Sequence, residues 1–171
     1  MQAFHGPTQV SRSFELTLQE PMAAIKERQC KPMASLSLEH SNELIRHAIE
    51  KAAADYGRPI CAAICDAAGF LVAFQRVESA PIRSIAISQA KAYSAARMQA
   101  NTDALLDRLR RENIALSYFC DDRLTALPGG SILKNAEGVM IGAVGISGLA
   151  AAEDQQIANH VAELAIQSVI R

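Results

Sequence analysis

Apolar residues recur at helical spacing in four parts of the chain. After Ser37 they form one stripe that ends at Gly57, which predicts a helix between these two residues. Further helices are predicted after Pro81, from Thr102 as a cap, and over about 152–170. The positions expected to face inward are Leu38, Ile45, Ala48, Ile49, Ala52 and Tyr56; Ile82, Ile85, Gln89, Ala92 and Ala96; Leu105, Leu106 and Leu109; and Ile157, Val161, Leu164 and Ser168.

Two pairs of short apolar runs are joined by four-residue turns. Runs 60–65 and 70–76 flank residues 66–69, and runs 132–134 and 139–146 flank residues 135–138. Asp or Asn at the first position and Gly at the fourth predict type I turns and therefore two antiparallel hairpins. With a further strand expected over 116–120, the order predicts an α+β fold. In it, helices cover a largely antiparallel sheet of about five strands, which excludes a Rossmann-type parallel sheet.

The first 34 residues differ from the rest. Pro7, Pro21 and Pro32 interrupt them, and only residues 13–18 alternate like a short strand. We expect residues 1–34 to form an N-terminal arm that contacts a neighbouring subunit, with disorder as the alternative. Residues 35–171 are then one domain.

The charge balance is even, with 17 basic and 18 acidic residues, so nucleic acid is not an expected partner. No apolar stretch approaches the roughly 20 residues of a membrane helix, and the N-terminus lacks a secretory pattern, so we expect a cytoplasmic protein. On a strand, Cys61 and Cys65 would lie about 13 Å apart, too far for a disulfide. Abundant alanine favours close subunit contacts and a homo-oligomer.

Several familiar motifs are incomplete in this chain. Gly142, Gly145 and Gly148 are spaced G-x-x-G-x-x-G, which is not the dinucleotide fingerprint, and no Walker lysine follows a glycine run. Ser147 lacks the second glycine of a hydrolase elbow. His40 and His47 are about 10.5 Å apart along a helix, and no His or Cys cluster suggests a metal site.

Lys91, Ser94 and Arg97 recur every three residues and form a ridge on one predicted helix. Lysine and arginine there can hold a carboxylate. Alternatively, the two cations pair with Glu78, Asp66 or Asp154, or reach solvent. Asp154 is expected in the first turn of the last helix, where the helix dipole favours a carboxylate. Small residues at strand ends allow close approach of a ligand, so the predicted binding set is Leu127, Pro128, Gly129, Gly130, Gly145, Ser147 and Gly148, together with Ser94.

From about Leu36 to Val169 the chain resembles the GlcG/HbpS family of small haem-binding and haem-degrading domains, which also form the C-terminal part of PduO-type proteins. The resemblance implies a profilin-like α-β-α fold, assembly into dimers or larger rings, and haem or corrinoid binding in some members. This chain departs from the family at Leu149, where a glycine is usual, and in its apolar residues 150–152. The motifs that carry the resemblance are Asp66-Ala67-Ala68-Gly69 with Leu71-Val72-Ala73-Phe74, Ala80-Pro81, Lys91-Ala92-Tyr93-Ser94-Ala95-Ala96-Arg97, Leu127-Pro128-Gly129-Gly130, Gly142-Ala143-Val144-Gly145-Ile146-Ser147-Gly148 and Asp154.

Three functions remain open from the sequence. The leading one is binding of haem or a related tetrapyrrole, which needs an axial donor, an apolar slot and cations for the propionates. The second is a cofactor-free lyase or isomerase for a small carboxylate or carbonyl compound. In that enzyme Lys91, Arg97 and glycine amides bind the substrate, and Lys91 or Asp154 moves a proton. The third is a structural or interaction role. The donors available to haem are His5, His40, His47, His160, Met98 and Tyr93.

Overall fold

The computed structural model describes residues 36–167. The predicted arm over 1–34, with its strand-like residues 13–18, and the predicted inward position Ser168 lie outside the described residues. The elements are α2 (Leu38–Tyr56), β1 (Cys61–Asp66), β2 (Leu71–Arg76), α3 (Arg83–Met98), α4 (Thr102–Glu112), the 3-10 helix η1 (Leu116–Phe119), β3 (Gly130–Lys134), β4 (Met140–Ser147) and α5 (Ala151–Gln167).

The strands form one antiparallel sheet in the order β2-β1-β4-β3, which confirms the α+β class. Both predicted turns are present, because Gly69 N donates to Asp66 O at 3.0 Å and Gly138 N donates to Asn135 O at 2.9 Å. The sheet has four strands within residues 36–167, so the expected strand over 116–120 is wrong. That segment is η1, which buries no residue and therefore has no core contact to hold it extended against the sheet.

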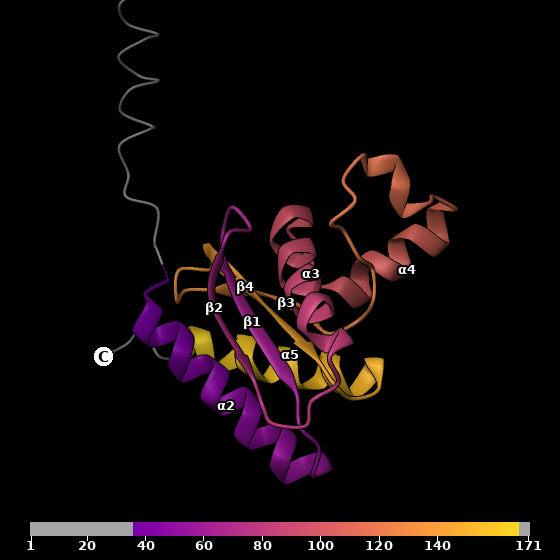
Figure 1. Cartoon of the computed structure of the whole chain (residues 1–171). Helices are drawn as coiled ribbons and strands as arrows, with labels where there is room; N and C mark the ends of the chain where they lie inside the picture. Colours follow the sequence, from indigo (N-terminus) through magenta and orange to yellow (C-terminus); the bar gives the residue numbers. More distant parts are fainter. Residues whose placement is uncertain (1–35, 168–171) are drawn as a thin grey trace, which may run out of the picture. The chain divides into compact units, whose positions relative to one another are not determined.

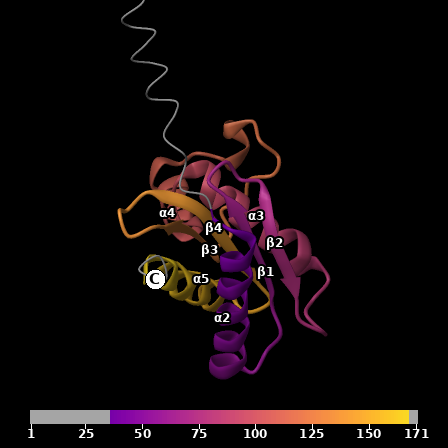
Figure 2. The same cartoon turned by 90° about the vertical axis from the view of Figure 1, so that its left-hand side faces the viewer.

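Helices cover both faces of the sheet, in three layers. On one face α2 packs beside β1 and β2 while α5 packs beside β3 and β4, and on the other face α3 crosses the sheet with α4 next to it (Figures 1 and 2). The main core lies between the sheet and the α2–α5 layer. Its largest fully buried members are Leu44, Ile45, Ile60, Ile64, Leu133, Ile146, Ile157, Val144 and Val161.

Helix α3 contacts the sheet through small and polar residues. A Cβ at Gly145 would overlap Ser88 O and Ala92 N, so the helix backbone lies directly on β4. The buried positions of α3 are Ser84, Ser88, Lys91, Ala92, Ser94, Ala95 and Ala96. The prediction that Ile82 faces inward is wrong: it is the cap residue before the first turn of α3 and is 79% exposed.

Helix ends follow the sequence signals with two corrections. Ser37 Oγ accepts from His40 N at 3.1 Å and Gly57, at φ 59°, ends α2, as predicted. Leu38 is exposed rather than inward, since it is the first residue of α2 and faces solvent. Thr102 is the first residue of α4 and not its cap, which is Asn101.

The described part of the chain has no helix long and apolar enough to span a bilayer. Cys61, Cys65 and Cys120 are free thiols, as expected for the first two.

Candidate functional site

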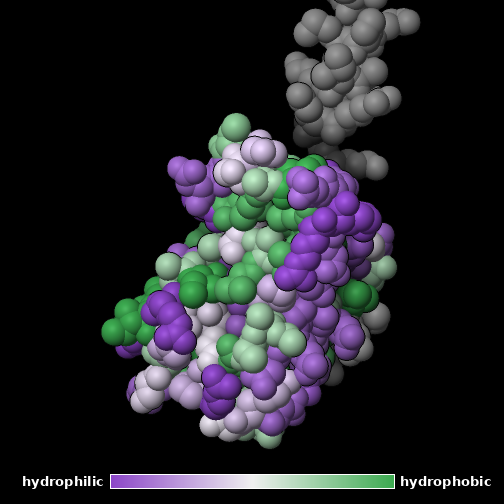
Figure 3. All heavy atoms as spheres, turned by 90° about the vertical axis from the view of Figure 1, so that its right-hand side faces the viewer, coloured by the Kyte–Doolittle hydropathy of each residue, from purple (hydrophilic) through white to green (hydrophobic). Residues whose placement is uncertain are grey.

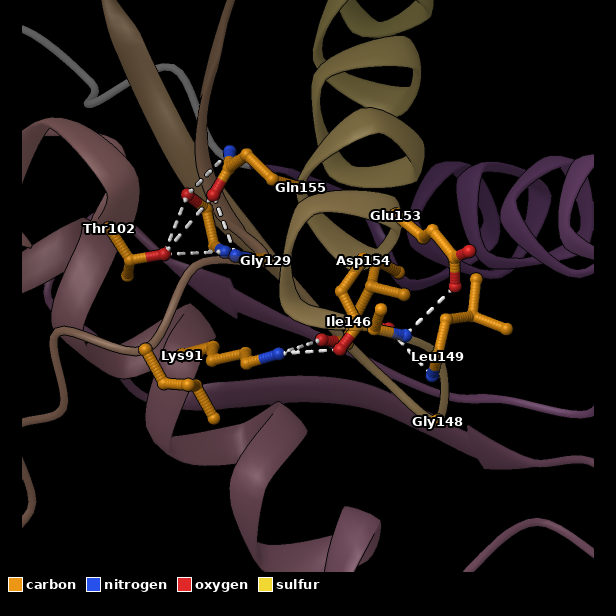
Figure 4. A network of polar contacts seen from close by, with 12 residues as sticks. Lys91, Thr102, Gly129, Ile146, Gly148, Leu149, Glu153, Asp154 and Gln155 are labelled. Atoms are coloured by element: carbon orange, nitrogen blue, oxygen red, sulfur yellow. Dashed lines mark hydrogen bonds and ion pairs between the residues drawn. The ribbon is translucent and has the colours of Figure 1, made fainter.

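A buried ion pair joins α3 to α5. Lys91 Nζ lies 2.8 Å from Asp154 Oδ2 and donates a second hydrogen bond, also of 2.8 Å, to Ile146 O (Figure 4). The side chains of Lys91 and Asp154 are 0% and 4% exposed. Of the partners that the sequence left open for Lys91, the structure shows Asp154. The pair therefore connects the middle of α3, the end of β4 and the first turn of α5.

The electrostatics of this pair balance two opposing effects. Burial raises the pKa of Asp154 and lowers the pKa of Lys91, because each charged group has lost its water. The attraction between the two charges opposes both shifts, and Leu149 N, which donates to Asp154 Oδ1 at 3.1 Å, further favours the carboxylate. Each partner is thus required for the other to remain buried.

Next to the pair, the amide groups of the glycine-rich segment are bonded within the protein. Gly129 N donates to Gln155 Oε1 at 2.6 Å, and Gly130 N donates to Thr102 Oγ1 at 2.8 Å. Gln155 Nε2 in turn donates to Ser131 Oγ at 2.8 Å and to Asn159 Oδ1 at 2.9 Å. The amides of Gly129 and Gly130 therefore stabilise the contact of α4, β3 and α5 and do not face a ligand.

Close packing explains why these positions are glycine. Gly129 has φ +125°, and a Cβ there would lie 2.6 Å from Lys91 Nζ. Gly130 lies against Lys91 O in the same way, and Gly145 lies under α3. Three of the predicted ligand-binding glycines thus have a structural role that the sequence analysis did not assign to them.

A cavity of about 220 Å³ lies beside the ion pair. It gathers four of the predicted site residues, namely Leu127, Ser147, Gly148 and Asp154. Its other lining residues are Arg83, Ser84, Ile87, Leu149 and Ala151. We call this space the Ser84–Ser147 cavity.

Sequence reasoning missed Arg83 and Ser84 in this lining. A usable signal exists, because Ser84, Ser88 and Lys91 follow one another at spacings of four and three, as one helical face does.

The predicted ridge of Lys91, Ser94 and Arg97 does not converge on one ligand. Lys91 is bonded to Asp154, whereas Ser94 Oγ donates to Ala90 O at 2.7 Å and accepts from Thr125 N at 2.7 Å. Arg97, in the last turn of α3, is exposed. Six residues on a helix separate Lys91 from Arg97 by about 9 Å along the axis, so the two cations belong to different places.

Arg97 lines a groove between the end of α3 and the segment after η1. The Arg123 guanidinium carbon lies 3.7 Å from the centroid of the Tyr93 ring and that of Arg97 lies 5.9 Å from it. Tyr93 Oη donates to Asp121 Oδ2 at 2.6 Å, which raises the pKa of Tyr93 and lowers that of Asp121. The groove has a volume of about 550 Å³ and is lined by Arg97, Met98, Phe119, Cys120, Asp121, Asp122, Arg123 and Leu124. We call it the Arg97–Arg123 groove.

A smaller hollow of about 300 Å³ adjoins the groove along the outer face of α3. It shares Asp122, Arg123 and Leu124 with the groove and adds Ala86, Gln89, Ala90 and Tyr93. The side of the molecule on which α3 and α4 lie shows separate hydrophobic patches among charged residues (Figure 3). Pro128 is half-buried and connects Leu127 to Gly129.

Residues 36–163 match the family model described as haem degrading protein HbpS-like. This chain belongs to the HbpS-like family. No curated protein sequence matches it significantly.

Solved structures of this HbpS-like fold are similar over most of the chain. A double mutant of HbpS from Streptomyces reticuli is 26% identical, with a TM-score of 0.70 over 80% of this chain and 90% of that one. The haem complex of PduOC is 29% identical, with a TM-score of 0.68 over 77% of this chain and 95% of that one. The ORFY protein of Klebsiella pneumoniae, at 22% identity, shows the fold alone, with a TM-score of 0.71 over 82% of this chain and 96% of that one.

The histidines of this HbpS-like chain that the structure describes lie on the other side of the sheet from α3. His40 and His47 are in α2 and His160 is in α5. The Arg97–Arg123 groove instead offers two sulfur donors, Met98 and Cys120. In residues 36–167, no group of three or more His, Cys, Asp or Glu side chains is arranged to hold a metal ion.

Proposed function

We propose that this chain binds haem or a related tetrapyrrole in the Arg97–Arg123 groove. The observation that carries the proposal is the combination of groups in its lining: two guanidinium groups, two sulfur atoms and apolar side chains. Haem is held in proteins by His, Met, Cys or Tyr at the iron, and its propionates pair with cationic side chains. The groove supplies both kinds of group on one surface.

The chemistry of these residues fits the group. Arg97 and Arg123 form no ion pair with a carboxylate of residues 36–167, so both guanidinium groups can pair with propionates. Asp121 and Asp122 share the lining and oppose an anionic ligand, so the two arginines have to outweigh them. Cys120 is an exposed free thiol, and Phe119 and Leu124 provide apolar surface. A volume of about 550 Å³ falls in the range of about 300–1,000 Å³ usual for cofactor sites.

The family supports the same function. The HbpS-like description concerns haem, and the PduOC neighbour was solved as a complex with haem. In this chain, Cys120 or Met98 would hold the iron, which supplies ligand-binding or redox chemistry when bound. Arg97 and Arg123 would orient the macrocycle through its propionates.

Haemin titration of the full chain, followed by visible absorbance, is expected to give a saturable Soret shift with one haem per chain. Cys120→Ser or Met98→Leu should change the position of the shifted band, because one of them removes an iron ligand. Arg97→Gln and Arg123→Gln should each weaken binding roughly three- to tenfold, since each removes a charge-assisted contact at an exposed site.

Two variants serve as controls for this titration. Arg110→Gln removes an exposed arginine of α4 outside the groove and should leave the titration unchanged. His47→Ala tests α2. A shift that His47→Ala abolishes and the groove variants leave intact would place the haem elsewhere, and an unsaturable titration would reject haem binding altogether.

We also propose that the chain forms a homo-oligomer. β2 is an edge strand of the sheet, and exposed Phe70 and Leu71 lie at its start. Such an edge favours pairing with another chain. Light scattering after gel filtration should give a mass of at least twice the 18.4 kDa of one chain, and Leu71→Lys should reduce it. A wild-type mass of 18.4 kDa at micromolar concentration would contradict this.

A cytoplasmic location stays a prediction. It is supported by the three free thiols of the described residues, one of them exposed, since exposed thiols persist in reducing compartments.

A further inference from the structure

Two serine hydroxyls face the Ser84–Ser147 cavity without a hydrogen-bond partner among residues 36–167. Ser84, near the start of α3, and Ser147, the last residue of β4, are 2% and 4% exposed, and both line the cavity. Neither side chain makes a hydrogen bond within residues 36–167. Every fully sealed side-chain nitrogen or oxygen of these residues does have a partner, so the two hydroxyls retain contact with the cavity. Nearly buried hydroxyls without a partner are costly and favour a ligand that bonds them.

The charges around the cavity favour an anion. Arg83 lines the rim and has no ion-pair partner among the described residues. Ala151, where α5 begins, is also in the lining, but Leu149 N and Ala150 N at this helix end already donate to Asp154 Oδ1 and Glu153 Oε2, so Arg83 is the group that attracts the anion. Asp154 is neutralised by Lys91 at 2.8 Å (Figure 4). Glu153, in the same turn, lies 3.5 Å from Arg58 Nη1, which offsets its charge.

The volume of the Ser84–Ser147 cavity and its apolar lining residues limit which ligands can enter it. A volume of about 220 Å³ holds roughly seven water-sized groups. Ile87, Leu127 and Leu149 provide apolar surface beside the two hydroxyls. A ligand for this space is small, with one charged end and a short aliphatic part.

We propose that the Ser84–Ser147 cavity binds a small aliphatic monocarboxylate. Its carboxylate accepts hydrogen bonds from the Ser84 and Ser147 hydroxyls and pairs with Arg83, while its chain packs on Ile87 and Leu127. The residues differ from those of the Arg97–Arg123 groove, so this inference does not depend on haem binding.

Isothermal titration calorimetry of the full chain with four probes tests the proposal. Sodium butyrate is expected to bind saturably, with one molecule per chain. 1-Butanol and butylammonium, which keep the chain but lack the negative charge, should not bind. Inorganic phosphate, which keeps a negative charge but lacks the chain, should bind at least tenfold more weakly than butyrate.

Variants locate the binding. Arg83→Gln should weaken butyrate binding about tenfold, and so should the double variant Ser84→Ala/Ser147→Ala, because each removes hydrogen bonds to a charged group. Arg110→Gln and Ser117→Ala change exposed residues outside the cavity and should leave the affinity unchanged. Arg83→Gln should also leave the haemin titration unchanged, which separates the two sites.

Three results would overturn the proposal. They are the absence of saturable butyrate binding to the wild type, butanol binding as tightly as butyrate, and full affinity in both cavity variants. Thermal unfolding of each variant checks that it is folded. Since Arg83 is exposed, Arg83→Gln tests the cavity even if the double serine variant does not fold.

Discussion

Lys91→Met is expected to destabilise the protein by about 3–5 kcal/mol, because it leaves the Asp154 carboxylate buried without its charge partner. The geometry is demanding: the ammonium lies 2.8 Å from both Asp154 Oδ2 and Ile146 O, and its side chain is fully buried. Removal breaks the contact of α3 with the end of β4 and with the first turn of α5. Urea unfolding followed by circular dichroism measures the loss.

The double variant Lys91→Met/Asp154→Leu tests whether the loss comes from the unpaired charge of Asp154. It removes both charges and replaces them with apolar groups of similar volume, so most of the stability should return. As a reference, Arg108→Ala breaks an exposed pair with Glu112 at 3.2 Å and should cost less than about 1 kcal/mol. If Lys91→Met cost no more than Arg108→Ala, the buried pair would have no structural role.

Gly145→Ala is the second change with a large expected effect, a loss of about 3 kcal/mol or more. The added Cβ would meet Ser88 O and Ala92 N, two backbone atoms of α3 that cannot rotate away. The helix would have to move off β4, and overpacking of this kind in a close-packed contact is destabilising. Denaturant unfolding measures the free energy, and near-ultraviolet circular dichroism reports on α3, which carries Tyr93.

Gly138→Ala is the control for Gly145→Ala, because it introduces backbone strain without a steric clash. Gly138 has φ +77° and nothing within 4 Å of an added Cβ, so its substitution costs only the strain of about 1 kcal/mol. Equal losses for the two alanine variants would mean that the close approach of α3 to β4 does not explain Gly145.

The sequence predicted the parts of the fold that local chemistry determines. Ser37 and Gly57 define the ends of α2, and the turns after Asp66 and Asn135 define both hairpins. In these cases the signal lies within a few residues and does not depend on the rest of the chain. The family resemblance was confirmed by the match over residues 36–163.

Where tertiary contacts decide the outcome, the sequence was less informative. On α3 the predicted inward positions Ala92 and Ala96 are buried, but Ile82 is exposed, and the helix also buries serines against the glycine of β4. The partner of Lys91 is 63 positions away, so helix spacing left it open. Helix spacing also predicted that Arg97 and Lys91 share one ridge. In the folded chain Lys91 is buried and Arg97 is exposed, which the spacing alone does not show.

The hydrogen bonds that α5 makes near Gly129 help to fix the register of β3 along β4. Gln155 and Asn159, one turn apart on α5, bond Ser131, and Asn101 Oδ1 accepts from Ile132 N at 3.0 Å. If β3 slipped by one residue along β4, Ser131 would turn to the opposite face, and Gln155 and Asn159 would lose their hydrogen bonds to its hydroxyl while keeping the bond to each other. Each lost hydrogen bond would cost about 0.5–1.5 kcal/mol, so misaligned pairings are disfavoured independently of the hydrophobic pattern. The side-chain amides of Gln155 and Asn159 therefore favour the observed register of β3 over the neighbouring ones.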